Sequence, residues 1–496
     1  MLNRCARVAL VIVMMAVFGI ISLAFIVPRT ELAVEQQDSG DFAVWIVLHE
    51  LLARGHLLYR DVWDHKDPGF YLIPHFFFSL LGVRGLYWFG LLATSLFGVG
   101  IALLIRSLVG WLAGMGIAAG ATMYYASWTP FWATYTENYS LGFLALGLGL
   151  VIEFPALAGF VLALACTIKF GVIVVCMTLF FLGLVRGICL SVSLSALWRL
   201  LLGFLGGLIT FFLLYWNELD PRDWLEVIIF NREYAQRRSS PFQWGDLKDV
   251  MVSAPSAIQW LLGVCTASTL VGLGLKKIPS SRVPRDELFT PLQIAFAALS
   301  GGIVLMVLQH PPAIQHWLFL WGATLYAACV AMCFCISRLP WRVVRFVALT
   351  GLCLPVLLYY QKGIQFVRGF SVQSAYSFAD SKANLREYIK NLPENTTFAI
   401  IGGNDNRLDF AEAPRNIRLL CRFFFQFEIF SPRFDKDIDS CIDKKPMIFF
   451  LNNNHRRLNV LEQIERLKRE YVICAQPPGV YTIYGSSKEV CDHIRG

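Results

Sequence analysis

The residues best suited to chemistry lie in one polar segment between two apolar runs, where positions 38–73 read DSGDFAVWIVLHELLARGHLLYRDVWDHKDPGFYLI. Asp38 and Asp41 stand where a helix is predicted to begin. Carboxylates there suit the helix dipole and can cap the helix, and alternatively one of them acts as a general base at the membrane–water boundary. Lys66 supplies a cation for an anionic ligand, and His65 beside it either touches the same ligand or faces water.

Three further ionisable residues lie in or next to apolar stretches. Glu137, in TYTENYSLGF, is either a second acidic group of a site or a solvated loop carboxylate. Lys169 lies within an apolar run, where a charge is costly and usually marks function, unless the side chain reaches the membrane surface. His316 stands at the outer start of a predicted span and either serves the site or caps and hydrogen-bonds locally.

An arginine cluster lies in a second polar segment, where positions 216–240 read WNELDPRDWLEVIIFNREYAQRRSS. This segment is predicted to lie outside, so Arg232, Arg237 and Arg238 break the positive-inside rule locally. A basic cluster on that side of a membrane indicates an anionic ligand. For Arg237 and Arg238, anchoring to anionic lipid head groups is an equal alternative.

The composition sets the class of protein that must position these residues. The chain has 496 residues, a mean hydropathy of +0.56, 56% hydrophobic residues and 16% charged residues, against about 25% charged residues in soluble domains. This balance excludes a soluble enzyme, a disordered chain and a nucleic-acid-binding domain. Apolar runs long enough to cross a hydrocarbon core recur, so the sequence predicts a mainly α, polytopic membrane protein. The net charge of +8 fits basic cytoplasmic loops and needs no nucleic-acid partner.

The first apolar run, from Val8 to Val27, is predicted to be a retained span rather than a signal peptide, because it is long and lacks a small-residue cleavage site. Arg4 and Arg7 then hold the N-terminus in the cytoplasm. Ten more spans bring the count to about eleven, although the short ones between 139 and 185 can merge. They are predicted at 86–105, 110–127, 139–152, 156–170, 171–185, 198–216, 257–275, 291–309, 314–336 and 342–360.

The first external loop, 28–68, is predicted to contain an amphipathic helix over Phe42–Leu58. Apolar residues recur there three or four positions apart, so the helix is expected to lie on the membrane surface. The following residues, 69–82, are apolar but short and are interrupted by Pro74. They predict a re-entrant or juxtamembrane helix.

The composition changes near residue 370. We predict a transmembrane catalytic domain over 1–365 and a small extracytoplasmic α/β domain over 370–496, outside because the number of spans is odd. In the second domain, helices are predicted at 377–391 and 460–470, and strands at 397–401, 447–451, 472–475 and 480–484. Four cysteines there can form disulfides in any of three pairings; they are Cys421, Cys441, Cys474 and Cys491.

The first loop resembles that of the GT-C integral membrane glycosyltransferases, in the branch that contains the protein O-mannosyltransferases and the aminoarabinose transferases. The segments around Glu137, Lys169 and His316 also resemble, in order, later parts of that family. One departure is Asp67, which follows Lys66 where such loops often have proline or glycine. The positions of the first loop that match are Asp38, Gly40, Phe42, Tyr59, Arg60, Asp61, Trp63, Asp64, Lys66 and Pro68.

The resemblance implies transfer of a sugar from a polyprenyl-phosphate donor to an acceptor hydroxyl on the external face, by direct, inverting displacement. Asp38 would be the general base and Glu137 a second acidic group. The acceptor would be a glycan, a lipid or a protein. A divalent cation can take part, but no cofactor is required. Substrate binding is assigned to Asp41, Tyr59, His65, Lys66, Lys169, Arg232, Arg237, Arg238 and His316.

Two other functions suit a membrane protein of this kind. One is a transporter or flippase for a lipid-linked sugar, a class that tends to show internal repeats and broken helices near the membrane midplane. We find no internal repeat, and the charged residues cluster in one-sided loops rather than in the middle of helices. The other is a non-catalytic scaffold whose external domain binds a partner. A scaffold would not need the carboxylates of the first loop, so a change at Asp38 separates the three hypotheses.

Overall fold

The computed structural model divides into two compact units. The helical unit comprises Met1–Glu31, Leu72–Leu214 and Ala235–Phe370, and the sheet unit comprises Leu32–Tyr71, Tyr215–Tyr234 and Ser371–Gly496. The first polar loop therefore groups with the C-terminal residues, whereas the predicted domains have a single boundary near 365–370. The structure describes residues 13–14, 16–20, 40–128, 134–191, 193–238, 252, 254–274, 288–308, 316–339, 385–401, 413–421, 423–424, 438–452, 461–476 and 481–495.

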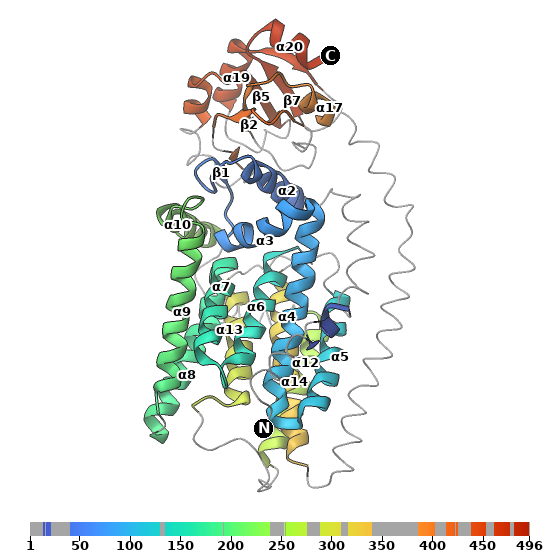
Figure 1. The fold of residues 1–496 in the computed structure, drawn as a ribbon, viewed down its shortest axis with the longest axis vertical. Helices are drawn as coiled ribbons and strands as arrows, with labels where there is room; N and C mark the ends of the chain where they lie inside the picture. Colours follow the sequence, from blue (N-terminus) through green and yellow to red (C-terminus); the bar gives the residue numbers. More distant parts are fainter. Residues whose placement is uncertain are drawn as a thin grey trace. The chain divides into compact units, whose positions relative to one another are not determined.

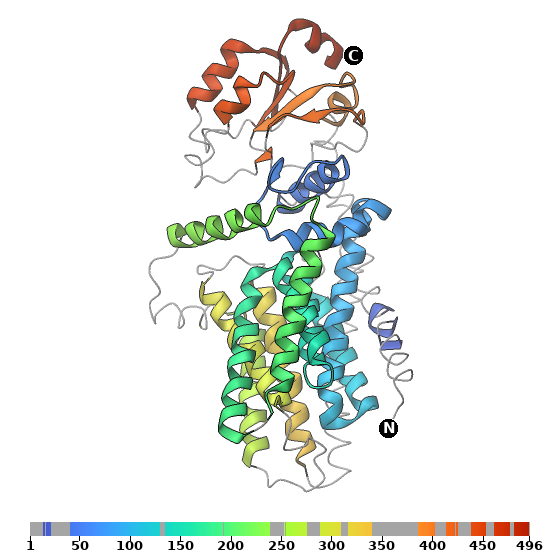
Figure 2. The ribbon, with the colours of Figure 1, turned by 60° about the vertical axis from the view of Figure 1, so that its left-hand side comes forward.

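Nine of the predicted spans fall on described residues, and each is a helix close to its predicted bounds. The long helices of the helical unit run side by side (Figures 1 and 2). Residues 13–14 and 16–20 of the first predicted span are helical, and the predicted span 342–360 lies outside the described residues. The nine helices are α4 (Val83–Val109), α5 (Trp111–Trp128), α6 (Thr136–Leu150), α7 (Pro155–Ile168), α8 (Ile173–Leu190), α9 (Ser195–Leu214), α12 (Ser256–Gly274), α13 (Pro291–Leu308) and α14 (His316–Ser337).

Six helical segments among the described residues are long and apolar enough to cross a membrane, which makes the chain a multi-pass membrane protein. They correspond to α4, α8 with the 3₁₀ turn η1 (Phe170–Val172) before it, α9, α12, α13 and α14. The helices α6 and α7, with 15 and 14 residues, reach only about 22 Å each. The short pieces do not merge, because Pro155 starts a new helix at α7 and the chain leaves helical geometry at Lys169. The total of about eleven crossings stays a prediction.

Neighbouring helices approach closely where glycines face a backbone. A Cβ atom on Gly142 of α6 would collide with the carbonyl of Ala93 in α4, and one on Gly203 of α9 would collide with the carbonyl of Ala156 in α7. Such contacts hold membrane helices together, since apolar burial gives little drive where the surrounding lipid is itself apolar. Gly203 and Gly207 therefore lie on the packing surface of α9 toward α7.

The helix of the first loop differs from the prediction. It is α2 (Gly40–Ala53), and it ends five residues before the expected Leu58. The chain reverses because Gly55 adopts a φ of +86° and the amide of His56 returns to the carbonyl of Leu51. Residues 44–51 are buried all round rather than on one face. A helix that lies on a membrane surface would leave one face exposed, so the predicted surface-lying amphipathic helix is wrong.

Two further helices contact this loop, one directly after it in sequence and one much later in the chain. The short helix α3 (Pro68–Leu81) contains Pro74 and has 14 residues, so it is too short to span the roughly 30 Å core. The helix α10 (Pro221–Arg238) begins with proline at its first position, and Asp220 Oδ1 accepts a hydrogen bond of 2.8 Å from the amide of Arg222. Proline and aspartate at these positions are the usual start signal of a helix.

The C-terminal residues form a mixed five-stranded sheet in the order β3-β2-β5-β7-β6. β5 (Ile448–Asn452) pairs in parallel with β2 (Thr397–Ile401) and antiparallel with β7 (Tyr481–Gly485). Ile448–Leu451 are fully buried, as expected of a central strand covered on both faces. β3 (Arg418–Leu419) and β6 (Val472–Ala475) form the edges, and the described helices are α17 (Leu385–Lys390), α19 (Leu461–Glu470) and α20 (Lys488–Arg495).

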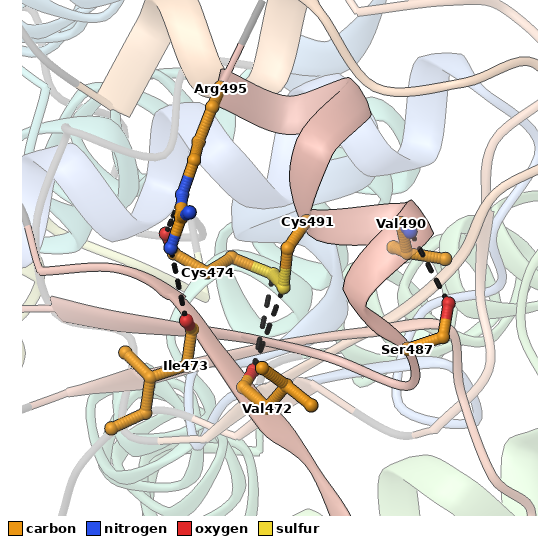
Figure 3. The surroundings of a disulfide bond; sticks show 7 residues. All are labelled: Val472, Ile473, Cys474, Ser487, Val490, Cys491 and Arg495. Carbon is orange, nitrogen blue, oxygen red and sulfur yellow. Dashed lines mark hydrogen bonds between the residues drawn. A yellow bond between two sulfur atoms is a disulfide. The ribbon is translucent and has the colours of Figure 1, made fainter.

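Two disulfides close this domain. Cys421 pairs with Cys441, and Cys474 pairs with Cys491. The second bond ties α20 to the edge strand β6, and Arg495 adds a 2.6 Å hydrogen bond from Nε to the carbonyl of Cys474 (Figure 3). The structure thus selects one of the three pairings that the sequence left open.

The glycine contact between α7 and α9 can be tested by a matched pair of substitutions. Gly203→Leu should lower the free energy of unfolding by about 1–3 kcal/mol or more, because the side chain meets a backbone that cannot yield. Gly206→Leu, three residues on, should change it little, since nothing lies within 4 Å of a Cβ atom there. Thermal unfolding in detergent measures both. Equal losses would contradict the packing assignment.

Candidate functional site

In the helical unit, the alternating chain direction brings three predicted site residues to the same end of the bundle. The loop 151–154 joins α6 and α7, so the start of α6 and the end of α7 lie together. Glu137 is in the first turn of α6, and Lys169 directly follows α7. His316 is the first residue of α14. Helix order therefore positions side chains that are up to 179 residues apart in sequence.

These three side chains form a polar cluster in which Glu137 and Lys169 are buried and His316 is partly exposed. Lys169 Nζ lies 2.6 Å from Glu137 Oε1, and His316 Nε2 lies 3.9 Å from the same oxygen. Thr136 donates a 2.9 Å hydrogen bond to Glu137 Oε2. The Glu137 side chain is only 3% exposed and that of Lys169 9%. Glu137 is thus not a solvated carboxylate, and the Lys169 ammonium is paired inside the protein instead of reaching the membrane surface.

A hydrogen-bonded network fixes the start of α6, which carries Glu137. Asn138 is fully buried, and its amide nitrogen donates to the carbonyl of Gly90 in α4 at 3.2 Å. Its amide oxygen accepts from the hydroxyl of Tyr125 in α5 at 3.0 Å. Tyr139 adds a 2.8 Å hydrogen bond to the carbonyl of Leu86. Polar groups satisfied in this way specify one arrangement of the three helices.

The Glu137–Lys169 pair has a clear chemical consequence. Each ion removed from water costs several kcal/mol, so the carboxylate and the ammonium persist as ions because they compensate each other. Glu137 can then accept hydrogen bonds as a fixed anion, for example from a hydroxyl group. His316, beside the same oxygen, is placed to share such a ligand.

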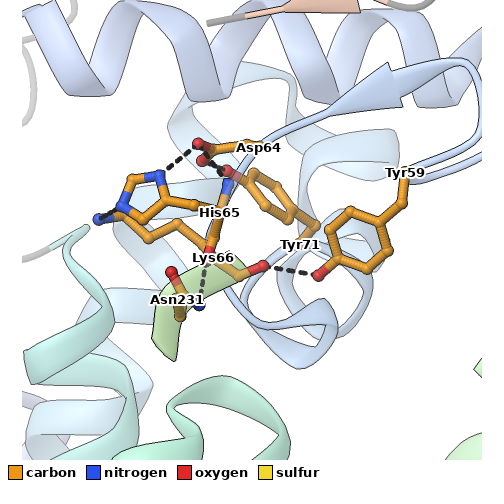
Figure 4. Close-up of polar contacts among 6 residues, drawn as sticks. All are labelled: Tyr59, Asp64, His65, Lys66, Tyr71 and Asn231. Atoms are coloured by element: carbon orange, nitrogen blue, oxygen red, sulfur yellow. Dashed lines mark hydrogen bonds and ion pairs between the residues drawn. The ribbon is translucent and has the colours of Figure 1, made fainter. Parts of the chain in front are cut away.

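In the sheet unit, a tightly turned loop carries Lys66. The amide of Leu57 donates to Asp61 Oδ2 at 2.8 Å, and the amides of Asp61 and Val62 return to the carbonyl of Leu57. Tyr59 adopts a φ of +63°, which is uncommon for a residue with a bulky side chain. The buried Tyr59 hydroxyl donates a 2.6 Å hydrogen bond to the carbonyl of Lys66 (Figure 4). Tyr59 therefore braces the backbone that presents Lys66.

Asp64, His65 and Lys66 form a relay of hydrogen bonds (Figure 4). His65 Nδ1 lies 2.8 Å from Asp64 Oδ1, and Lys66 Nζ lies 3.1 Å from His65 Nε2. Because the carboxylate and the ammonium are charged, Nδ1 carries the imidazole proton and Nε2 accepts from Lys66. Tyr71 donates to the other oxygen of Asp64. The relay aims the ammonium, which has two more N–H donors for an anion.

Charge also stabilises the relay. Burial alone would raise the pKa of Asp64, but in the acidic range, where the His65 ring is protonated, its charge and that of Lys66, with the hydrogen bonds from His65 and Tyr71, outweigh burial and hold the pKa at about 2. Burial, together with nearby carboxylates, raises the pKa of the Tyr59 hydroxyl well above its usual range. Asp64 is therefore an anion, and Tyr59 a neutral donor, at any pH at which the protein works.

The helix α10 is joined to the loop at three points. The indole of Trp224 donates to Asp67 Oδ1 at 3.0 Å, and the amide of Asn231 donates to the carbonyl of His65 at 2.8 Å. The ring of Phe230 packs against Trp63 at 4.5 Å. Asp67, the departure from the family pattern, is thus a buried acceptor for α10. Arg232, next to Asn231, is exposed.

A polar cavity of ≈ 630 Å³ lies beside the loop. Its walls combine Arg60 and the loop residues before it with the segment 216–223, which contributes Trp216, Arg222 and three carboxylates. Burial raises the pKa of one of these carboxylates, Glu218. Aromatic, cationic and carboxylate groups around one space suit a hydroxyl-rich or charged ligand.

The remaining predicted site residues are only partly placed. Asp38 lies outside the described residues. Asp41 is in the first turn of α2, and Arg237 and Arg238 are in the last turn of α10, but the positions of these side chains are not described. Among the described residues, no group of three or more His, Cys, Asp or Glu side chains is arranged to hold a metal ion.

Sequence reasoning did not assign roles to Asp64, Tyr71, Trp224 or Asn231. Asp64 belongs to the matching pattern of the first loop, so its spacing before Lys66 was a usable signal. Asn231 lies in FNREYA (230–235), a segment with an N-x-x-Y-A pattern that also resembles the family. Trp224 has no such signal, because a hydrogen bond from α10 to a loop over 150 residues earlier leaves no periodic mark in either segment.

Comparison with known proteins identifies the fold. No family model and no curated protein matches the chain. Among solved structures it is similar to ArnT from Cupriavidus metallidurans bound to undecaprenyl phosphate, with 13% identity and a TM-score of 0.59, over 98% of this chain and 99% of that one. The oligosaccharyltransferase of Archaeoglobus fulgidus, solved with Zn and sulfate, scores 0.43 at 11% identity, over 96% of this chain and 73% of that one.

The first likeness shows a shared fold along nearly the whole chain. The class of protein is therefore a multi-pass membrane protein with the fold of ArnT. At 13% identity this likeness shows the fold alone.

A charge-removal series tests the buried pair. Lys169→Met should destabilise the protein by about 3–5 kcal/mol, because it leaves Glu137 uncompensated. The double variant Lys169→Met with Glu137→Gln should regain much of that loss. Lys468→Met, which breaks an exposed pair with Glu465, should cost far less, because water screens that pair. Thermal unfolding of the variants in detergent gives the coupling, and additive losses would show that the two charges do not interact.

The pH dependence of stability tests the position of Asp64. Its folded pKa of about 2 lies below the ordinary 3.8, so its contribution, roughly 2 kcal/mol, is full above pH 4 and is lost as the pH falls through 2. Asp64→Asn should therefore be less stable than the natural protein at neutral pH, and the gap should narrow from pH 4 to pH 2. Asp492→Asn, at an exposed position of α20, should show no such gap. Thermal unfolding at stepped pH measures it.

Proposed function

We propose that the protein is an integral membrane glycosyltransferase that moves a sugar from a polyprenyl-phosphate donor to an acceptor hydroxyl on the external face. The observation that carries the proposal is the convergence of Glu137, Lys169 and His316 on one polar cluster. Each was assigned to a site from its own segment of sequence. The fold shared with ArnT, whose structure contains undecaprenyl phosphate, supports the same function.

The donor phosphate is assigned to Lys66. Its ammonium is aimed by His65 and Asp64, while Tyr59 holds its backbone. A fixed cation near the departing phosphate stabilises the negative charge that develops there without reorganising during the reaction. Arg232, Arg237 and Arg238 on α10 supply further positive charge for the phosphate. The lipid tail of the donor remains in the bilayer, which explains why such an enzyme needs a membrane fold.

The chemical step is a direct displacement. Asp38 takes the proton of the acceptor hydroxyl, and the oxygen forms a bond to the anomeric carbon. The bond from that carbon to the phosphate oxygen breaks, and polyprenyl phosphate leaves with the electron pair, so the anomeric configuration inverts. A general base contributes typically 10²–10⁴-fold to such a step. Glu137, fixed as an anion, orients the acceptor or helps to hold a divalent cation.

The identity of the donor gives the most direct test of the function. The protein purified from its own membranes should retain a polyprenyl phosphate that bears a sugar, and mass spectrometry of the extracted lipids gives both chain length and sugar mass. Preparations of the Lys66→Met variant should retain much less of this lipid. The absence of any sugar-linked polyprenyl phosphate from the natural protein would count against the proposal.

Replacement of Asp38 tests the proposed base. With the extracted donor and an acceptor from the same envelope, Asp38→Asn should lower transfer by about 10²–10⁴-fold, because only the proton acceptor is lost. Binding of undecaprenyl phosphate should be unchanged. Glu35→Gln, three residues earlier in the same loop, is the matched control and should keep full activity. Unaltered transfer by Asp38→Asn would refute the assignment of the base.

The same variant separates the alternative of a transporter or flippase for a lipid-linked sugar. Such a protein would move the intact donor across a vesicle membrane and release no free polyprenyl phosphate. Movement of the intact donor without sugar transfer, equally by the natural protein and by Asp38→Asn, would favour the transporter.

A further inference from the structure

The loop that carries Lys66 pairs with a distant part of the chain. The short strand β1 (Val62–Trp63) ends three residues before Lys66 and pairs in parallel with β4 (Phe423–Phe424). Val62 lies opposite Phe423, and Trp63 opposite Phe424. A two-residue strand has no stability of its own, so its geometry depends on the partner that it finds.

A second contact reaches the same region from the end of α2. The guanidinium of Arg54 donates from Nη1 to the carbonyl of Pro414 at 2.9 Å and from Nη2 to the carbonyl of Ala413 at 3.1 Å. The planar guanidinium offers donors in a fixed fork, and here two of them meet consecutive carbonyls. Arg54 thus clamps the start of the loop onto the segment 413–424, which also contains β4.

The segment 413–424 is itself anchored to the C-terminal sheet. The amides of Arg418 and Leu420 donate to the carbonyls of Thr396 and Phe398 at 2.8 and 2.9 Å. Cys421, two residues before β4, is buried and bonded to Cys441. A rigid sheet and a covalent bond therefore lie behind both contacts to the loop.

We propose that the segment 413–424 of the C-terminal domain is a positioning device for the donor-phosphate site, and that Arg54 is the residue through which it acts. The inference rests on the proposed function, because it assigns the C-terminal domain a part in donor binding. Arg54 touches no reacting group. Its bonds limit the motion of residues 54–66, so the Lys66 ammonium is already in place when the phosphate arrives.

The physical argument is preorganisation. Binding to an ordered loop avoids the entropy cost of fixing the loop at the moment of binding. The relay from Asp64 to Lys66 aims one ammonium within hydrogen-bond distances, and a displacement of about 1 Å is enough to weaken such a site severely. The turn at Tyr59, with its positive φ, needs surrounding structure to hold it. The C-terminal segment supplies that structure from outside the loop.

Two measurements on the full chain in detergent test the proposal. Hydrogen exchange reports the order of residues 57–67, and titration with undecaprenyl phosphate reports the affinity for the donor phosphate. Arg54→Ala should raise both the exchange rate of the loop and the dissociation constant by at least about tenfold, since hydrogen bonds to a charged group are lost. Arg54→Lys, which can still reach one carbonyl, should recover part of both effects.

A matched control lies in the same segment. Arg415 follows Pro414 and is exposed, so Arg415→Ala removes the same charge without removing the clamp. It should change neither measurement. The two disulfides offer a second matched pair: Cys421→Ser with Cys441→Ser should weaken phosphate binding, whereas Cys474→Ser with Cys491→Ser, on α20, should not. If the first pair fails to accumulate, the Arg54 series alone decides.

The outcomes separate the two proposals. Unchanged exchange in Arg54→Ala would overturn the positioning role, and faster exchange with an unchanged dissociation constant would overturn its link to donor binding. Equal effects of Arg54→Ala and Arg415→Ala would show that loss of positive charge, not loss of the Arg54 hydrogen bonds, causes the change. That result would also overturn the positioning role. If the natural protein does not bind undecaprenyl phosphate, the proposed function fails, and the exchange data alone decide whether Arg54 holds the loop.

Discussion

A charge enclosed in an apolar helical bundle must be compensated, and the Glu137–Lys169 ion pair meets this requirement in the helical unit. The pair joins the first turn of α6 to the break that follows α7. The ion pair therefore favours this arrangement of α6 and α7, because an arrangement that separated the two side chains would leave each ion buried without a partner. Next to Glu137, hydrogen bonds among Asn138, Tyr125 and Tyr139 and the carbonyls of α4 satisfy the other buried polar groups at the start of α6.

The sheet unit solves a related problem for a loop. Lys66 lies in an irregular segment, which by itself would not hold an ammonium in one place. The Asp64–His65 relay orients the side chain, Tyr59 holds the backbone, and α10 closes over the loop through Trp224 and Asn231. The depressed pKa of Asp64 shows that this charge distribution favours the folded state at working pH. Order in the loop is thus built from contacts within the loop and from contacts with α10.

These two clusters are consistent with the demands of a sugar transfer from a lipid phosphate. The leaving group is already good, so the protein has to supply fixed charges and a proton acceptor rather than a covalent intermediate. The fold shared with ArnT at 13% identity indicates that helix order and chain direction, which set where such charges lie, survive extensive replacement of side chains. Which sugar and which acceptor are used depends on side chains and cavities that the fold alone does not define.

The sequence by itself determined the local structure of the chain. Hydropathy placed nine described helices within a few residues, and β-rich runs placed strands such as Thr397–Ile401, because both patterns arise from neighbours in the chain. The sequence also identified ionisable residues next to apolar runs as site candidates, among them Glu137, Lys169 and His316. The periodicity of α2 led to the wrong prediction of a helix on the membrane surface. Apolar residues three or four apart also occur in a helix that is buried all round, as α2 is.

Only the tertiary structure decided which residues meet. It paired Cys421 with Cys441 and Cys474 with Cys491, gave Asp67 to Trp224, and brought Arg54 to the carbonyls of Ala413 and Pro414. The physical reason is that these contacts join segments distant in the chain, and their energy depends on geometry that no local pattern encodes. The sequence shows which residues are charged, but only the folded chain determines which partner compensates each buried charge.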